Sequence, residues 1–155
     1  MQRVVNRVLS FAVMCGDAHV ACLARGLRTL LFRVEGPACS ELVVGFNGSD
    51  LDGFRAAMLE VGVDVPTASL VRDGEVLDFQ HATGVEVRAH FFTFRSDFAE
   101  ARNKSFSFAR SEWVAYFDAD DVLADTSHPA FADSLEQDPP TSAIETYPVK
   151  GTLPE

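Results

Sequence analysis

The stretch Trp113-Val-Ala-Tyr-Phe-Asp-Ala-Asp-Asp-Val-Leu123 decides the fold expected for this chain. Five apolar or aromatic residues are followed at once by Asp118, Asp120 and Asp121, which predicts a buried strand that ends on carboxylates. Three acids this close repel one another unless a cation lies among them. Mg²⁺ and Mn²⁺ prefer such oxygen ligands, often together with substrate phosphates. The stretch predicts a metal–diphosphate site at the carboxyl end of a strand, the alternative being the start of a solvated loop.

A helix is predicted just before this strand, in Asp97-Phe-Ala-Glu-Ala-Arg-Asn103, with Ser96 or Asp97 as its cap. More Phe residues follow in the same helix, so we expect much of its circumference to be buried. Arg102 then needs an anionic partner. Because Arg matches phosphate oxygens in a fork geometry, we predict a diphosphate contact, the alternative being an ion pair with one of the aspartates. Asn103 could bind the ligand or cap backbone groups.

Strands and helices alternate in the first half of the chain. The predicted strands are residues 8–14, 41–46, 85–91 and 113–117. The predicted helices are residues 20–31, a segment from about residue 51, and the segment after residue 97. This order predicts a single α/β domain over residues 1–155, a mostly parallel open sheet with helices on both faces.

Three further segments have weaker signals. Asp73-Gly74 lies between two apolar pieces and predicts an inserted hairpin around residues 69–78. Residues 128–135 could form one short helix. Residues 142–149 could form an edge strand, which would offer a surface for a homo-oligomer.

Polar loops follow the first two predicted strands. Asn47-Gly48-Ser49-Asp50 closes the second strand and opens a helix, a place where backbone donors and Asn47 can meet a ligand. An ordinary turn is the alternative reading of this loop. Asp17 follows the first strand and can cap the next helix.

Composition excludes some classes of protein. The 155 residues are 47% hydrophobic, enough for one core, and carry a formal net charge of −10. That charge argues against a general nucleic-acid binder, which needs a basic stripe. Cys15, Cys22 and Cys39 lack zinc-site spacing, so we expect reduced thiols in a cytoplasmic protein. No stretch has transmembrane length.

The chain resembles the family 2 glycosyltransferases, whose Rossmann-like A-type fold is a nucleotide-sugar-binding α/β domain. The likeness is strongest over residues 90–123: an aromatic residue, then Asp-Phe-Ala-x-Ala-Arg-Asn, an acid before Trp-Val, and Asp-x-Asp-Asp. It implies metal-dependent, inverting transfer of a sugar from a UDP- or GDP-linked donor to an acceptor that the sequence does not identify. Asp118 would lie by the ribose and base, with Asp120 and Asp121 as ligands of Mn²⁺ or Mg²⁺. Arg102 would help to hold the diphosphate.

The chain departs from this family in three places. Phe46, followed by Asn47, stands where the family usually has an Asp that reads the base. Cys15-Gly16-Asp17 occupies the region of a common Asn-Glu pair, which leaves Asp17 as the substitute. The acceptor-binding half, which normally carries the catalytic base, is expected to be largely absent. Glu145, the only acid in the last predicted strand, is not assigned as that base.

Two other functions fit parts of the sequence. A degenerate, non-catalytic module of the same fold would bind a nucleotide or a protein partner, in keeping with Phe46 and the short C-terminus. A nucleotidyltransferase would use the same acids for phosphoryl transfer. That class usually has a Gly-rich loop after its first strand, and Cys15-Gly16-Asp17 is a poor match for one.

Overall fold

The computed structural model describes residues 8–34, 36–67, 74–124 and 146–148 of the chain. Its strands are β1 (Leu9–Cys15), β2 (Glu41–Phe46), β3 (Val76–Gln80), β4 (Glu86–Phe91), β5 (Trp113–Asp118) and β6 (Thr146–Pro148). Its α-helices are α1 (Val20–Leu31), α2 (Leu51–Glu60) and α3 (Phe98–Ser107), and a 3₁₀ turn, η1 (Asp17–His19), precedes α1. None of the described helices is long and apolar enough to cross a membrane.

The strands form one sheet in the order β3-β4-β2-β1-β5-β6. β1 pairs in parallel with β2 and β5, and β2 pairs in parallel with β4. Only the outer pairs, β3 with β4 and β5 with β6, are antiparallel. β1 and β2 are buried along nearly their whole length, as expected of parallel strands covered on both faces. The predicted α/β fold with a mostly parallel sheet is confirmed.

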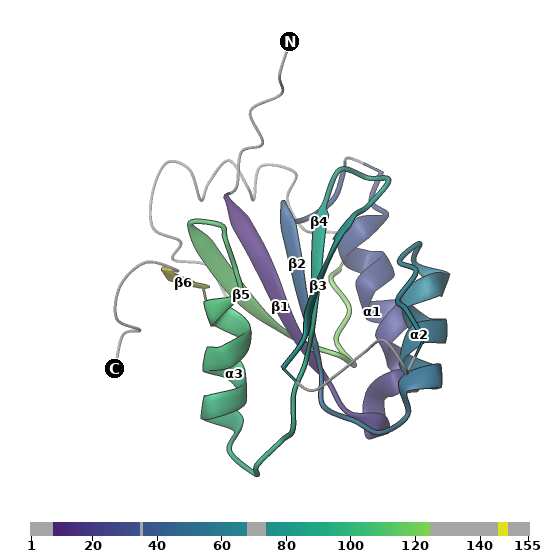
Figure 1. The fold of residues 1–155 in the computed structure, drawn as a ribbon. Coiled ribbons are helices and arrows are strands. Elements are labelled where there is room, and N and C mark those ends of the chain that lie inside the picture. The colour runs from purple at the N-terminus through teal and green to yellow at the C-terminus, as the bar shows by residue number, and fades with distance from the viewer. Residues whose placement is uncertain (1–7, 35, 68–73, 125–145, 149–155) are drawn as a thin grey trace.

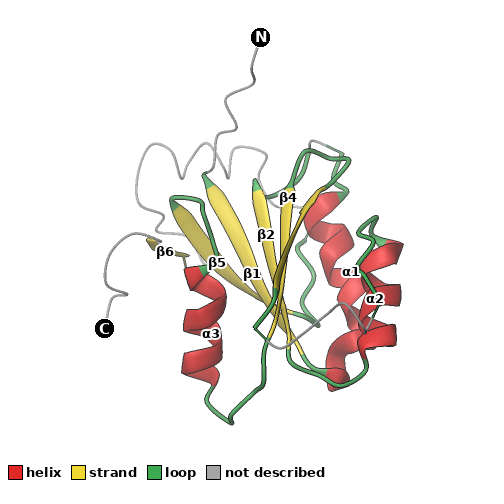
Figure 2. Cartoon of the chain, viewed as in Figure 1, coloured by secondary structure: helices red, strands yellow, loops and turns green. Residues whose placement is uncertain are grey.

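Helices cover the two faces of the sheet unequally. Figure 1 shows α1 and α2 on one face and α3 on the other, and Figure 2 shows the three layers in the same view. The larger apolar cluster lies on the α1–α2 side. A small second cluster lies under α3 and contains Ala12, Val43, Phe106, Ala109 and Val114.

The prediction that α3 is buried over much of its circumference is wrong. Only Ala101, Ser105 and Phe106 of this helix are buried, whereas Phe98 is 67% exposed. Among the described helices α3 covers its face of the sheet alone, so only one side of it finds partners. Asp97 caps the helix as predicted, because its carboxylate accepts the backbone N–H of Glu100 at 3.1 Å.

The segment predicted as an inserted hairpin is in part a strand of the main sheet. β3 pairs with β4 residue for residue, from Val76 opposite His90 to Gln80 opposite Glu86. The tight connection therefore lies after β3, where Gly84 has a φ of 94°. The first arm of the predicted hairpin lies outside the described residues, as do the predicted helix at 128–135 and most of the predicted strand at 142–149.

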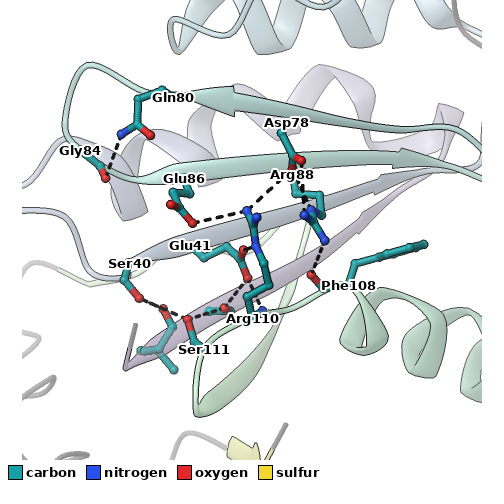
Figure 3. Close-up of polar contacts among 12 residues, drawn as sticks. Ser40, Glu41, Asp78, Gln80, Gly84, Glu86, Arg88, Phe108, Arg110 and Ser111 are labelled. Carbon is teal, nitrogen blue, oxygen red and sulfur yellow. Dashed lines mark hydrogen bonds and ion pairs between the residues drawn. The ribbon is translucent and has the colours of Figure 1, made fainter. Parts of the chain in front are cut away.

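A buried polar network ties the amino ends of the strands together (Figure 3). Glu41 begins β2 and is 1% exposed. Its carboxylate accepts from Ser10 Oγ at 2.8 Å and from the backbone N–H of Arg110 at 2.7 Å. The Arg110 guanidinium also forms ion pairs with Glu86 and Asp78. The network anchors the α3–β5 connection, so it helps to position α3 and the start of β5.

Candidate functional site

The three aspartates meet at the carboxyl end of β5. Asp118 ends the strand and pairs in register with Met14 of β1. Asp118, Asp120 and Asp121 are exposed, and each offers a carboxylate oxygen that lies within 4.8 Å of the others. A set of three carboxylate oxygens suits a hard divalent cation, so these residues could hold Mg²⁺ or Mn²⁺.

A tight turn brings these acids together. The Asp121 backbone N–H donates to the Asp118 carbonyl at 2.9 Å. In return, the Asp118 backbone N–H donates to Asp121 Oδ2, also at 2.9 Å. Residues 118–121 therefore form a doubly hydrogen-bonded turn at the end of the strand. The sequence motif alone implies that the three carboxylates lie close together, because they belong to four consecutive residues.

Helix α1 packs against this turn. A Cβ added at Gly26 would lie 2.6 Å from the Asp121 carbonyl oxygen and 3.4 Å from that of Ala119. Thr29 Oγ1 accepts the backbone N–H of Leu123 at 2.9 Å. The chain after the turn therefore runs against α1, and the absence of a side chain at Gly26 allows the close approach.

An open cleft of about 380 Å³ lies beside the aspartates. Its polar lining includes Asn47, His19, Asp118 and Asp120. The carboxyl ends of β1, β2 and β5 contribute to it, at the edge of a parallel sheet where α/β proteins generally bind ligands. The fold thus brings Asn47 beside two of the predicted metal ligands.

His19 is a polar lining residue that sequence reasoning did not assign to the site. Its Nε2 lies 4.0 Å from Asp120 Oδ2. About a hundred positions separate the two residues in the chain, so no local spacing signals their contact. Adjacent parallel strands β1 and β5 bring them together.

Arg102 contacts an aromatic residue that lines the cleft. Its Cζ is 4.3 Å from the ring centroid of Tyr116, a residue that lines the cleft. Arg102 Nε is buried and has no hydrogen-bond partner. No ion pair joins Arg102 to an aspartate within the described part of the chain, so the alternative of an internal ion pair gains no support.

Tyr116 connects this arginine with the acidic turn. Burial, a hydrogen bond to Asp118 and the negative charge of that carboxylate together raise the pKa of Tyr116 to about 12. The phenol therefore stays protonated at neutral pH, with its hydroxyl available as a donor to Asp118.

Asp17 binds a neighbouring loop. Its Oδ2 accepts from the backbone N–H of Ser49 at 3.0 Å and from Ser49 Oγ at 2.8 Å, and its Oδ1 accepts from the Asp50 N–H at 2.8 Å. These hydrogen bonds lower the pKa of the Asp17 carboxyl. The expectation that Asp17 caps the following helix is wrong, because α1 has no side-chain cap and the carboxylate joins the loops after β1 and β2 instead.

The structure also places three other residues that the sequence predictions named. Asn103 is exposed on α3 and does not line the cleft. Phe46 is 3% exposed, and its ring stacks on Phe54 of α2 with centroids 4.5 Å apart. Phe46 therefore belongs to the core on the far side of the sheet from α3. Cys15 is a buried free thiol whose pKa burial raises to about 12, which rules out a thiolate nucleophile there.

The arrangement so far defines a Rossmann-like α/β protein with an acidic ligand cleft at the carboxyl edge of its sheet. The profile of glycosyl transferase family 2 matches residues 75–152, about half of the chain, from β3 through α3 and the Asp118 turn. The chain belongs to this family. A comparison with curated proteins gives no significant match.

Proposed function

We propose that this chain binds a nucleoside-diphosphate sugar, UDP- or GDP-linked, and serves as the donor-binding domain of a glycosyltransferase. The observation that carries the proposal is the cluster of Asp118, Asp120 and Asp121, whose oxygens lie within 4.8 Å of one another and of which the first two line a cleft. Family membership supports glycosyl transfer in general. The acidic turn supports the narrower donor class, because a diphosphate and a divalent cation share such sites.

The residues that would hold a divalent cation are the three aspartates of the turn. Their carboxylates are exposed and offer oxygens close to one another, and their mutual repulsion falls when a cation binds. Bound there, Mn²⁺ or Mg²⁺ would neutralise charge on the nucleoside diphosphate as it leaves.

Arg102 is proposed to contact the diphosphate. Its guanidinium is held against the Tyr116 ring, and its buried Nε–H has no partner in the protein. A buried donor without a partner costs free energy unless a ligand satisfies it. Asn103, one position along the exposed side of α3, is proposed as an outer contact.

The loops after β1 and β2 are proposed to hold the nucleoside end. Asn47 lines the cleft and carries both a donor and an acceptor. Asp17 fixes that loop through Ser49 and Asp50, so its contribution to donor binding would be mainly indirect. Asp118, which lines the cleft, would lie nearest the ribose.

The proposed reaction inverts the anomeric carbon by direct displacement, with an acceptor hydroxyl as nucleophile. A carboxylate base would take the proton of that hydroxyl. The rival is a non-catalytic module of the same fold, which would bind the donor and leave it intact.

Calorimetric titration of the whole chain with UDP, GDP and their sugar conjugates tests donor binding. We expect one nucleotide to bind with Mn²⁺ and to lose affinity in chelator. Asp120→Asn should weaken binding at least about tenfold, whereas Asp52→Asn, an exposed acid on α2, should bind as the parent does. Equal binding by Asp120→Asn would refute the site assignment.

Incubation of the same complex with the sugar conjugate separates transfer from binding. Slow metal-dependent hydrolysis of the donor, with water in place of the acceptor, supports a glycosyltransferase. Tight binding with no hydrolysis at any pH would favour the non-catalytic module.

A further inference from the structure

The cleft has an aromatic wall to which the proposed function assigns no role. Phe94 and Phe98 line it together with Tyr116. The Phe94 and Phe98 rings lie 5.0 Å apart between centroids and are tilted by 53°. The aromatic wall, meaning Phe94 and Phe98, belongs to the β4–α3 connection and the first residue of α3.

Phe98 is one of the exposed large apolar side chains of this fold. Its side chain is 67% exposed although it stands on a ligand cleft, so it contributes little to the core. Single exposed apolar residues are common and need no explanation. Here, however, a second phenylalanine lies against the exposed one, and both line the cavity that also contains Asp118 and Asp120.

The backbone between the two rings is held in a costly conformation. Ser96 has a φ of 60°, the only positive φ at a non-glycine residue among those the structure describes. Such a conformation is sparsely populated and persists where the surroundings impose it, often at ligand sites. Ser96 forms a bend between Phe94 and the helix cap Asp97, and the rings on both sides of this bend line the cleft.

The loop after β2 contributes one polar side chain to the cleft. Phe46 ends β2 but is packed against Phe54 in the core, so its side chain does not line the cleft. Asn47 is the polar residue that this loop contributes there. A planar base entering the cleft would therefore meet one amide on one side and an aromatic surface on the other.

We propose that Phe98, supported by Phe94, is the stacking surface for the nucleobase of the donor. The inference rests on the proposed function, which places the diphosphate at the aspartates and Arg102. A nucleoside diphosphate joins a charged end to a flat aromatic end, and the cleft offers acids and an arginine next to aromatic rings. Stacking accepts every base, because each has a π-face, so the fine choice between bases falls to Asn47.

The test compares ligands that share the diphosphate but differ in the base. UDP, GDP and inorganic pyrophosphate are titrated with Mn²⁺ into the parent chain and into Phe98→Ala, Phe98→Leu and Phe98→Tyr. We expect Phe98→Ala to weaken the better nucleotide about 5- to 100-fold and to leave pyrophosphate unchanged. Phe98→Tyr should retain binding, and Phe98→Leu, which is apolar without a π-face, should resemble the alanine variant.

Controls separate this inference from the proposed function. Phe32→Ala removes another exposed phenylalanine, at the end of α1 and outside the cleft, and should not alter any affinity. Asp120→Asn should weaken pyrophosphate and nucleotides alike. Unchanged nucleotide binding by Phe98→Ala, or an equal loss for nucleotide and pyrophosphate, would overturn the stacking role while the metal–diphosphate site stands. A parent chain that binds none of the three ligands would overturn both.

Discussion

Arg110 Nε donates to Glu41 Oε2 over 2.8 Å, which joins residues 69 positions apart at the end of the sheet opposite the cleft. Glu41 is 1% exposed and also accepts from Ser10 and from the Arg110 backbone. Figure 3 shows Arg110 between this buried carboxylate and the outer acids Asp78 and Glu86. The loop between α3 and β5 is therefore held by these hydrogen bonds and ion pairs together with Ala109, a member of the small apolar cluster under α3.

Removal of this arginine should destabilise the fold. Arg110→Ala leaves the Glu41 carboxylate buried without its charge partner, and we expect the free energy of unfolding to fall by about 3 kcal/mol. Urea unfolding followed by circular dichroism measures the loss. Arg28→Ala is the control, because its ion pair with Glu60 is exposed on both sides and should contribute less than about 1 kcal/mol. Similar losses in the two variants would contradict the inference that the buried Glu41–Arg110 pair stabilises the fold more than an exposed ion pair does.

Gly26→Ala should be harmful although it improves helix propensity. Alanine is favoured over glycine inside a helix by about 1 kcal/mol. The added methyl group would lie 2.6 Å from the Asp121 carbonyl oxygen, so the acidic turn or α1 must shift. We expect lower stability and a Mn²⁺ affinity reduced severalfold, measured by thermal unfolding and by electron paramagnetic resonance. Arg25→Ala, an exposed change in the same helix, should alter neither; a stabilised Gly26→Ala with unchanged Mn²⁺ affinity would contradict the packing of the turn on α1.

His90 should make stability depend on pH. It is 1% exposed, its Nε2 lies 2.9 Å from Ser105 Oγ, and burial lowers its pKa from 6.5 to about 4. Between these values the unfolded chain binds more protons than the folded one, so stability is full above pH 6.5 and falls as the pH drops toward 4. The loss from this group approaches about 3 kcal/mol at the acid end.

Urea unfolding at several pH values checks this dependence. His90→Gln cannot take up the proton, so its stability should change less than that of the parent between pH 6.5 and 5, where few carboxyl groups titrate. If the free energy of unfolding of His90→Gln depends on pH as steeply as that of the parent, another group causes the pH dependence.

The contact between Arg102 and Tyr116 should matter for diphosphate binding. Arg102→Lys keeps the charge but loses the planar fork and the flat contact with the ring, and we expect about tenfold weaker nucleotide binding with Mn²⁺. Tyr116→Phe preserves the ring and should have a small effect, whereas Tyr116→Leu should resemble Arg102→Lys. If Tyr116→Leu binds as the parent does, the ring does not position the guanidinium.

Local patterns predicted most of the elements. β1, β2 and β5 occupy predicted segments that are nearly continuous apolar runs, as parallel strands covered on both faces are, and β4 occupies a predicted segment in which apolar and polar residues alternate. The acidic turn was equally predictable, since Asp118, Asp120 and Asp121 are close in sequence. The burial of α3 was predicted wrongly, because its phenylalanines suggested a core helix, whereas Phe98 faces the cleft and solvent.

Contacts between distant segments could not be predicted. His19 with Asp120, and Asp17 with the Ser49 loop, come from loops that only the order of parallel strands places side by side. The Glu41–Arg110 pair also escapes pattern reasoning, because both residues look like ordinary surface charges in the sequence.

The sequence by itself determined the alternation of strands and helices, the acidic end of β5 and the Arg102 helix, because each depends on residues within a few positions of one another. The tertiary structure alone decided what surrounds those acids. It placed Phe98 and Phe94 on the cleft, turned Phe46 into the core and set Arg102 on the Tyr116 ring. The reason is that a cleft at the edge of a parallel sheet is built from loops far apart in the chain, and their relative positions depend on strand order and packing.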